Sequence, residues 1–343
     1  MIFVCILILG MSRSSVAKET YQLEEGEWQK QTTLDRSTPE GQLQRIRTLL
    51  AEGRTKRARK LADQWIEQYA NHHLVAEAYL VRGDAWVAQK HYYKALYDYE
   101  YLARGYPASE HFLKALEREF EIARLFDGGV KRRLLGMRVI PAGSEAEELY
   151  LRIQERAPGS EIGMKASLAL ANRYFRKAEM TSAATAYELF LRNYPNSQHR
   201  EQAMLRVIQA NLATFKGPKF DPTGLIEAGE RLKAYRNQFP AAAERIGVDT
   251  LLVRIEESLA LKGYYRSQWY DRQGRTVSSV YTYRSVIRDY PRTTAAKLAI
   301  QQLARLGEPV VVQTNSPETI GEPVDLSPSN DGYELDADQE GSK

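Results

Sequence analysis

Hydrophobic positions between residues 167 and 197 recur at helical spacing in two separate runs. The first run holds Leu168, Leu170, Ala171, Tyr174 and Phe175, and the second holds Ala183, Ala186, Tyr187, Phe190 and Leu191. Residues 180–182 interrupt the pattern, and we expect a hydroxyl in this stretch to cap the second helix. Pro195 lacks an amide hydrogen and disfavours helical geometry at Tyr194, so the second helix should end there. The pattern predicts two short amphipathic helices, and neither buries enough surface to be stable alone.

The same arrangement returns along the chain at fixed offsets. Pro195 has counterparts at Pro107, Pro158, Pro240 and Pro291, with Ala70 in a first copy. Twelve residues before these anchors lie Ala58, Ala95, Ala146, Ala183, Ala228 and Ser279, and eight residues before them lie Ala62, Tyr99, Tyr150, Tyr187, Leu232 and Tyr283. A small residue lets two helices approach closely, a large ring fills the groove beyond it, and proline ends the helix. Offsets of this kind indicate stacked repeats that need their neighbours to bury an apolar face.

These offsets match the tetratricopeptide pattern. The clearest copies also carry its first-helix positions, which are Tyr79, Gly83 and Trp86 before Ala95, and Leu170, Ala171 and Tyr174 before Ala183. An ordinary helical bundle is the alternative, but a bundle requires no fixed small, aromatic and proline offsets. We therefore predict an all-α fold, a solenoid of five to six helix-turn-helix pairs.

The N-terminal segment is expected to direct export. An apolar run over residues 2–11 is too short to span a bilayer and has the size of a signal-peptide core. Ser15 and Ala17 are spaced like a peptidase site, so we predict a signal peptide over residues 1–17; an apolar terminus on a cytosolic protein is the alternative. Cys5 is the single cysteine, which excludes an intramolecular disulfide, and it lacks the small preceding residue of a lipidation site.

Three further segments differ in composition. Residues 18–37 are polar and read as a tether, and a Thr-Pro-Glu sequence at 38–40 is suited to start the first helix of a repeat domain over 38–307. Residues 308–343 hold nine acids, one lysine and four prolines, which predicts a disordered acidic tail. The tail carries a charge of −8 and the preceding 307 residues carry +12. This division favours association between the two, or an acidic partner with which the tail competes.

Two insertions lengthen the repeats. In the first, over 126–144, we expect a helix to end at Gly128, a basic loop to follow, and Ser144 with Glu147 to form a capping box for the next helix. The second covers 213–224. Insertions in repeat arrays lie in loops on one face, often the binding face, although they can equally cover a helix end. The candidate partner-binding residues are Lys131, Arg132, Arg133, Lys216, Lys219 and Asp221.

Signatures of catalysis or metal binding are absent from the sequence. The five histidines, His72, His73, His91, His111 and His199, show no metal-ligand spacing, and the adjacent pair is expected to lie solvated in a turn. The glycines form no phosphate-binding loop. Most aromatic residues occupy repeat-core positions, so they are not free to stack on bases beside the basic clusters. We therefore expect no catalytic residue, no cofactor, no metal and no nucleic acid, and instead a protein that binds other proteins.

The repeat ends resemble a known family. The sequences YPAS at 106–109, YPNS at 194–197 and YPRT at 290–293, together with the stretches 171–197 and 259–303, resemble the BamD (YfiO) family of outer-membrane assembly lipoproteins. The resemblance covers residues 39–306. It implies a tetratricopeptide domain, on the periplasmic face of the outer membrane, that binds the periplasmic domains of a BamA-like barrel insertase and contacts other lipoproteins. Peripheral association with the membrane is compatible with it.

The chain departs from this family in its lack of a lipidation site, its basic insertion and its long acidic tail. Two other functions therefore stay open, a general periplasmic adaptor of the CpoB type and a binder of anionic polymers. The function we expect is that of a non-enzymatic scaffold for outer-membrane β-barrel assembly. It would recognise an extended or helical peptide along the concave groove of its stacked first helices.

Overall fold

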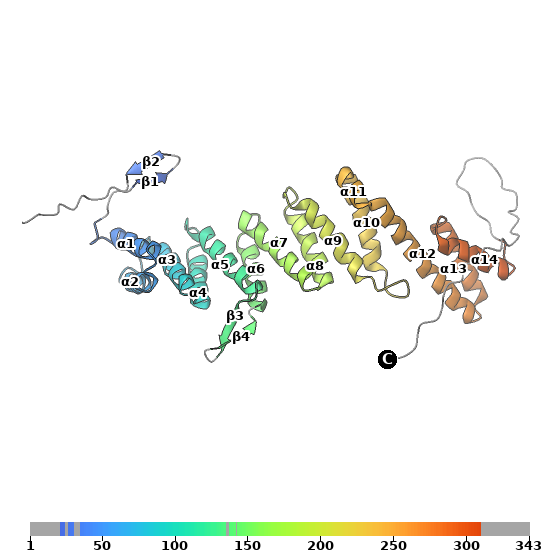
Figure 1. The fold of residues 1–343 in the computed structure, drawn as a ribbon, viewed down its shortest axis with the longest axis horizontal. Helices are drawn as coiled ribbons and strands as arrows, with labels where there is room; N and C mark the ends of the chain where they lie inside the picture. The colour runs from blue at the N-terminus through green and yellow to red at the C-terminus, as the bar shows by residue number, and fades with distance from the viewer. Residues whose placement is uncertain (1–20, 25–26, 31–34, 135–136, 142, 310–343) are drawn as a thin grey trace, which may run out of the picture. The chain divides into compact units, whose positions relative to one another are not determined.

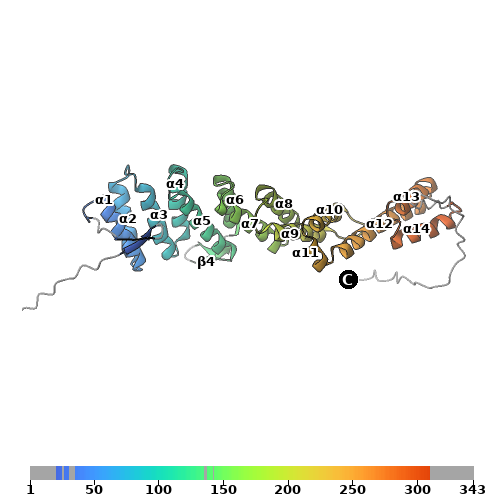
Figure 2. The same ribbon diagram turned by 90° about the horizontal axis from the view of Figure 1, so that it is seen from above.

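The computed structural model describes residues 21–24, 27–30, 35–134, 137–141 and 143–309, and this part contains fourteen α-helices and two β-hairpins (Figures 1 and 2). The expected signal peptide over 1–17 lies outside the described residues, as does the tail beyond residue 309. Contacts divide the chain into two compact units. The first comprises the described residues up to Phe215 together with Thr223–Val248, and the second comprises Lys216–Pro222 together with the described residues from Asp249 onward.

The first unit is a succession of helices in which each helix packs on the next along the chain (Figure 1). Its helices are α1 (Pro39–Ala51), α2 (Thr55–Gln68), α3 (Val75–Ala88), α4 (Tyr92–Gly105), α5 (Phe112–Asp127), α6 (Gly143–Arg156), α7 (Glu161–Arg176), α8 (Met180–Asn193), α9 (Arg200–Thr214), α10 (Thr223–Gln238) and α11 (Pro240–Ile246). This architecture confirms the predicted all-α fold of stacked helical pairs.

The positions that define the repeat lie at the helix contacts. Ala95, Tyr99, Ala146, Tyr150, Ala183, Tyr187 and Tyr283 are all buried, and Pro107, Pro158, Pro195 and Pro291 each follow the end of a helix. At the start of α1, the hydroxyl of Thr38 accepts a hydrogen bond from the Gly41 amide at 3.1 Å, as the sequence predicts. The Trp65 indole of α2 donates to the Pro39 carbonyl at 2.9 Å and so joins the first two helices.

The second unit contains α12 (Val248–Arg272, from Asp249), α13 (Thr276–Asp289) and α14 (Thr294–Arg305). Its core is built from Tyr264 of α12, Tyr283 of α13 and Leu303 of α14, with smaller residues between them. The Glu257 carboxylate accepts hydrogen bonds from the amides of Thr294 and Ala295, at 2.8 and 3.1 Å. A negative charge at the start of α14 is stabilised by the free amides there.

Two hairpins replace segments that the sequence suggested to be irregular. Strands β1 (Tyr21–Glu24) and β2 (Glu27–Lys30) pair within the expected tether, and β3 (Lys131–Leu134) pairs with β4 (Met137–Pro141) in the expected basic loop. The prediction of a loop was therefore wrong at residues 131–133. Two short runs separated by a glycine are a hairpin signal, and the density of charge in both segments obscured it.

The turn between α7 and α8 differs from the expected hydroxyl cap. Helix α8 begins at Met180 and its preceding residue, Glu179, makes no side-chain cap. Instead Ala178 adopts a left-handed conformation with φ 59°, and the amides of Ala178 and Glu179 return to carbonyls of the last turn of α7. This backbone closure makes the connection too short for a capping side chain.

The expected capping box at the start of α6 is also not formed. The helix begins at Gly143, which places Ser144 inside the first turn, where its hydroxyl donates to Glu145 at 2.9 Å. Glu147 instead accepts a hydrogen bond from the Tyr174 hydroxyl of α7 at 2.6 Å. The Glu147 carboxylate was expected to cap its own helix, but it is bound to Tyr174 of the neighbouring helix.

Candidate functional site

A cavity of about 590 Å³ opens in the first unit where α5, α6 and α7 meet. It is lined by Phe120, Arg124, Asp127, Gly128, Tyr150, Lys165, Leu168, Ala169, Asn172 and Arg176. Most of these residues belong to α5 and α7, which are first helices of their repeats and contact each other directly. We call this cavity the α5–α7 groove.

One side of the groove is formed by two aromatic rings. In the pair α3–α4, Gly83 allows the Tyr99 ring to lie so close that a Cβ atom at Gly83 would be 2.3 Å from it. The residue 37 positions later in α5 is Phe120, whose ring lies 5.7 Å from that of Tyr150, the counterpart of Tyr99. The rings of Phe120 and Tyr150 therefore form an apolar wall. At the equivalent position of α3–α4, the backbone of α3 lies directly against the Tyr99 ring.

The rim of the groove is positively charged. Arg176 forms an ion pair with Asp127, which also binds Arg173 at 2.6 Å, and Lys165 is paired with Glu161 at 2.6 Å. The exposed guanidinium of Arg124 has no hydrogen-bond or ion-pair partner among the residues that the structure describes. It is therefore available to an anionic or carbonyl group of a ligand.

Asn172 adds an oriented polar group. Its carbonyl oxygen accepts a hydrogen bond from the Tyr187 hydroxyl at 2.6 Å. Burial raises the pKa of Tyr187 to about 12, so this hydroxyl keeps its proton and remains the donor at neutral pH. The bond fixes which way the Asn172 amide points, and its NH₂ group has no acceptor within the described part of the chain. Asn172 and Arg124 thus provide donors beside an apolar wall.

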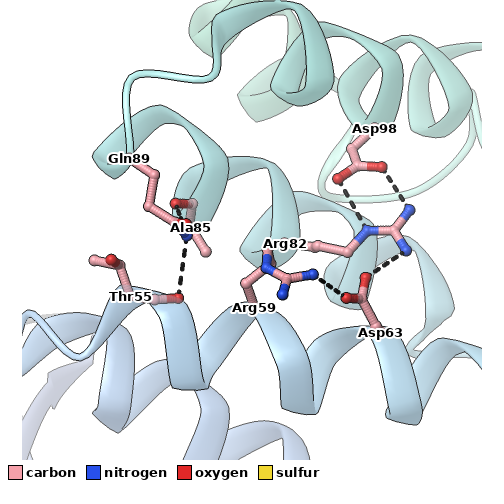
Figure 3. A network of polar contacts seen from close by, with 7 residues as sticks. All are labelled: Thr55, Arg59, Asp63, Arg82, Ala85, Gln89 and Asp98. Carbon is pink, nitrogen blue, oxygen red and sulfur yellow. Dashed lines mark hydrogen bonds and ion pairs between the residues drawn. The ribbon is translucent and has the colours of Figure 1, made fainter.

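A second polar cluster joins α2, α3 and α4 but is fully engaged (Figure 3). Arg82 donates to both oxygens of Asp98, at 2.6 and 3.0 Å, and to Asp63 at 3.2 Å, while Arg59 also binds Asp63. Gln89 donates to the Thr55 carbonyl at 3.4 Å. Each acid in this network has a cationic partner, so the network holds helices together rather than offering a binding site.

The candidate residues of the two insertions lie in two separate segments. Lys131, Arg132 and Arg133 lie on β3, where Lys131 is opposite Pro141 and Arg132 is opposite Ile140. Lys216, Lys219 and Asp221 lie between α9 and α10, in a segment that belongs to the second unit. Lys262 of α12 holds that segment by donating to the Phe220 carbonyl at 2.6 Å. Their role in partner binding remains a prediction.

Sequence reasoning missed the groove residues Phe120, Arg124 and Asn172. The available signal was Phe120, because a large ring stands there at a position that is Gly83 and Ala171 in the two clearest repeats. That signal requires the first helices to be aligned with one another, and the insertion after α5 obscures their alignment.

The adjacent histidines lie close to Glu40, with one potential ligand atom from each of the three residues within 4.8 Å of the others. His72 Nδ1 accepts a hydrogen bond from the Leu74 amide at 3.2 Å, so the neutral ring carries its proton on Nε2, which faces Glu40 at 3.4 Å. A metal bound at Nε2 would require the opposite tautomer. The hydrogen bonding therefore does not fit a metal centre. The ring of His72 also packs on Trp65, so it is half-buried rather than fully solvated.

Within the described residues, no helix combines the length and the hydrophobicity needed to cross a bilayer.

Residues 143–313 match the model of the YfiO family, which is described as outer membrane lipoprotein. No curated protein matches the chain. Among solved structures, the C-terminal part of a TPR repeat-containing protein from Cytophaga hutchinsonii is 12% identical over 77% of this chain and 88% of that chain, with a TM-score of 0.38. The assembly chaperone of RpL4 is 14% identical over 79% of this chain and 98% of that chain, with a TM-score of 0.28. The family match covers α6 to α14, and over this segment the chain is similar to the YfiO family, whose members are described as outer membrane lipoprotein.

Proposed function

We propose that the protein is a non-enzymatic scaffold in the assembly of outer-membrane β-barrel proteins. The family match over residues 143–313 supports a place at the cell envelope, on the periplasmic face of the outer membrane. By the same resemblance its partner would be the periplasmic part of a BamA-like barrel insertase. The α5–α7 groove would hold an extended segment of a protein partner.

The observation that supports this proposal is that hydrogen-bond donors lie beside apolar side chains in the same cavity. Arg124 and the Asn172 amide lack acceptors in the described structure, and the ring of Phe120 and the side chain of Leu168 line the same cavity. An extended peptide presents carbonyl oxygens along its backbone and side chains on alternate faces, so it can satisfy the donors and cover the rings together. The cavity also has the size of a site for a few residues.

A binding titration tests this function. The probe is a fluorescent ten-residue peptide copied from a β-strand of an outer-membrane barrel, and the readout is its anisotropy with the full-length protein. Arg124→Glu should weaken binding at least tenfold, since a lost charged hydrogen bond is worth ~1.5–3 kcal/mol. Lys60→Glu makes the same charge change on the exposed surface of α2 and should leave the affinity unchanged. Equal affinities for the wild type and both variants would exclude the groove as the peptide-binding site.

Competition separates the proposed function from the binder of anionic polymers. Polyglutamate added in excess should displace the barrel peptide only weakly at physiological salt, because the apolar wall contributes to peptide binding and is not screened. Full displacement by polyglutamate, together with loss of peptide binding at high salt, would favour the anionic-polymer function. Equal affinity for unrelated soluble peptides would favour the general adaptor.

A further inference from the structure

The outer face of α13 in the second unit carries an uncovered apolar stripe. Val277 is 86% exposed and Tyr281 is 66% exposed, and they share one face of the helix with Arg284 and Arg288. The spacing of four, three and four residues places these side chains in a single row. Two large apolar residues side by side at such exposure indicate a surface that another segment covers.

The described chain ends beside this row. Arg284 donates to the Glu308 carboxylate at 2.9 Å and to the Pro309 carbonyl at 3.3 Å. The Glu308 amide in turn donates to the Leu303 carbonyl at 3.0 Å, which fixes the direction of the chain after α14. The main chain is thus held against α13 at Arg284, in the middle of the row, when it enters the tail.

The next residues of the tail match the exposed stripe in chemistry. Pro309 is followed by Val310, Val311 and Val312, the only run of three apolar residues after Gly307. β-branched residues favour extended backbone, in which Val310 and Val312 point to the same side. The rest of the tail carries most of its nine acids.

The lengths also match. Val277 lies seven residues before Arg284, which corresponds to about 10.5 Å along a helix axis. Three residues of extended chain span about 10 Å. A strand that leaves Arg284 and runs toward the start of α13 therefore reaches Val277 with the third valine.

We propose that residues 310–312 bind along the outer face of α13, in extended conformation, with Val310 over Tyr281 and Val312 over Val277. The occupant is the chain's own tail, because its first residues are already bound at Arg284. Charge favours the same arrangement, since residues 249–307 contain ten Lys and Arg against five Asp and Glu, whereas the tail carries −8. The acidic remainder of the tail is thereby kept close to the second unit, and this unit's apolar row is closed to other proteins.

Disulfide trapping in the full-length protein tests the proposal. Cys5→Ser removes the natural cysteine, and Val277→Cys with Val312→Cys provides a pair that the proposed docking brings within bonding distance. Val277→Cys with Ser329→Cys is the matched control in the same tail. We expect the 277–312 disulfide to form about tenfold faster under mild oxidation, because docking raises the effective concentration of the two thiols. Equal rates for the two pairs would overturn the proposal.

A charge reversal identifies the anchor. Arg284→Glu should slow the 277–312 disulfide to the rate of the control pair, while Lys297→Glu, an equal charge change at an exposed position of α14, should not. Far-UV circular dichroism verifies that both variants fold. Disulfides that join two chains, seen as dimers on a non-reducing gel, would assign the apolar row to a second copy and reject the tail. An unchanged rate in Arg284→Glu would remove Arg284 as the anchor and with it the basis of the proposal.

Discussion

The helix pairs α3–α4 and α5–α6 carry different side chains at the same position of their helix contact. Arg82 of α3 lies opposite the buried Asp98 of α4 and binds both of its carboxylate oxygens. The residue 37 positions after Arg82 is Glu119 of α5, and the counterpart of Asp98 in α6 is Leu149. Glu119 is fully buried, and neither of its oxygens has a hydrogen-bond partner in the described structure.

The cation beside Glu119 is Arg156, which is hydrogen-bonded to another acid. Arg156 lies 3.8 Å from Glu119, but it donates to both oxygens of Glu100, at 2.5 and 2.8 Å. Burial therefore raises the pKa of Glu119 from 4.5 to about 7. The repeat thus specifies the backbone, while the charges at one shared position decide whether a helix pair is held by an ion pair or is sensitive to pH.

The largest loss of stability is expected from breaking the ion pair between Arg82 and Asp98. Arg82→Ala leaves the Asp98 carboxylate, 2% exposed, without its partner, and should lower the free energy of unfolding by about 3–5 kcal/mol. Urea denaturation measures this loss. Replacing both residues by leucine removes both buried charges and should cost far less, since α7 has Leu170 at the position of Arg82. A double variant as unstable as Arg82→Ala would contradict this account.

The second prediction removes the orphaned charge in α5–α6. Because the folded-state pKa of Glu119 is raised, the folded protein holds the proton more tightly than the unfolded chain, and stability falls as pH rises from about 4.5 to about 7. Glu119→Gln should flatten this dependence and raise the free energy of unfolding at pH 8 by about 1–3 kcal/mol. Thermal melts from pH 5 to pH 8 measure both effects. Glu117→Gln, at an exposed position of the same helix, is the control and should retain the wild-type pH profile.

The third prediction concerns the close approach that α5–α6 lacks. Gly83→Ala places a methyl group against the Tyr99 ring, which cannot move away because it is buried and its hydroxyl is bound to Asp84 at 2.7 Å. We expect a loss of about 1–3 kcal/mol in a denaturant titration. Gly105→Ala adds the same group where no atom lies within 4 Å and should not destabilise the protein. Similar losses in both variants would show that the close approach is not the cause.

The smallest effect is expected at the turns that close the two first helices. Lys90, after α3, has φ 61°, whereas α5 is followed by Gly129 with φ 96°. Lys90→Gly should stabilise the protein by about 0.5 kcal/mol, because the relief of left-handed strain outweighs the added freedom of the unfolded chain. Gly129→Ala should be destabilising for the same reason. Differential scanning calorimetry resolves the two signs, and a lower melting temperature for Lys90→Gly would refute the strain at this turn.

Sequence reasoning could predict the helical pairs because their determinants are local. Ala183, Tyr187 and Pro195 recur with the repeat, and each acts through size or backbone geometry that the sequence states directly. The α5–α7 groove was not predictable in this way. Phe120 acts by its distance from Tyr150, across the β3–β4 insertion, and Asn172 acts through a hydrogen bond to the next helix.

The caps were mispredicted for a related reason. Ser144 and Glu147 fit the sequence rule for a capping box, but Glu147 finds a stronger partner in Tyr174 of the neighbouring helix. Likewise, the turn at Ala178 is closed by backbone amides alone. Local rules describe what a segment can do, and tertiary contacts select among those options.

Arg82 has a consequence for how the chain can be divided. Its guanidinium reaches back to Asp63 of α2 and forward to Asp98 of α4, so a cut on either side of α3 severs an ionic contact (Figure 3). A shortened protein that begins on either side of α3 would therefore lose one of these ionic contacts. In native-state hydrogen exchange, the amides of α2, α3 and α4 should open together in one cooperative step rather than fray in sequence from the N-terminal end.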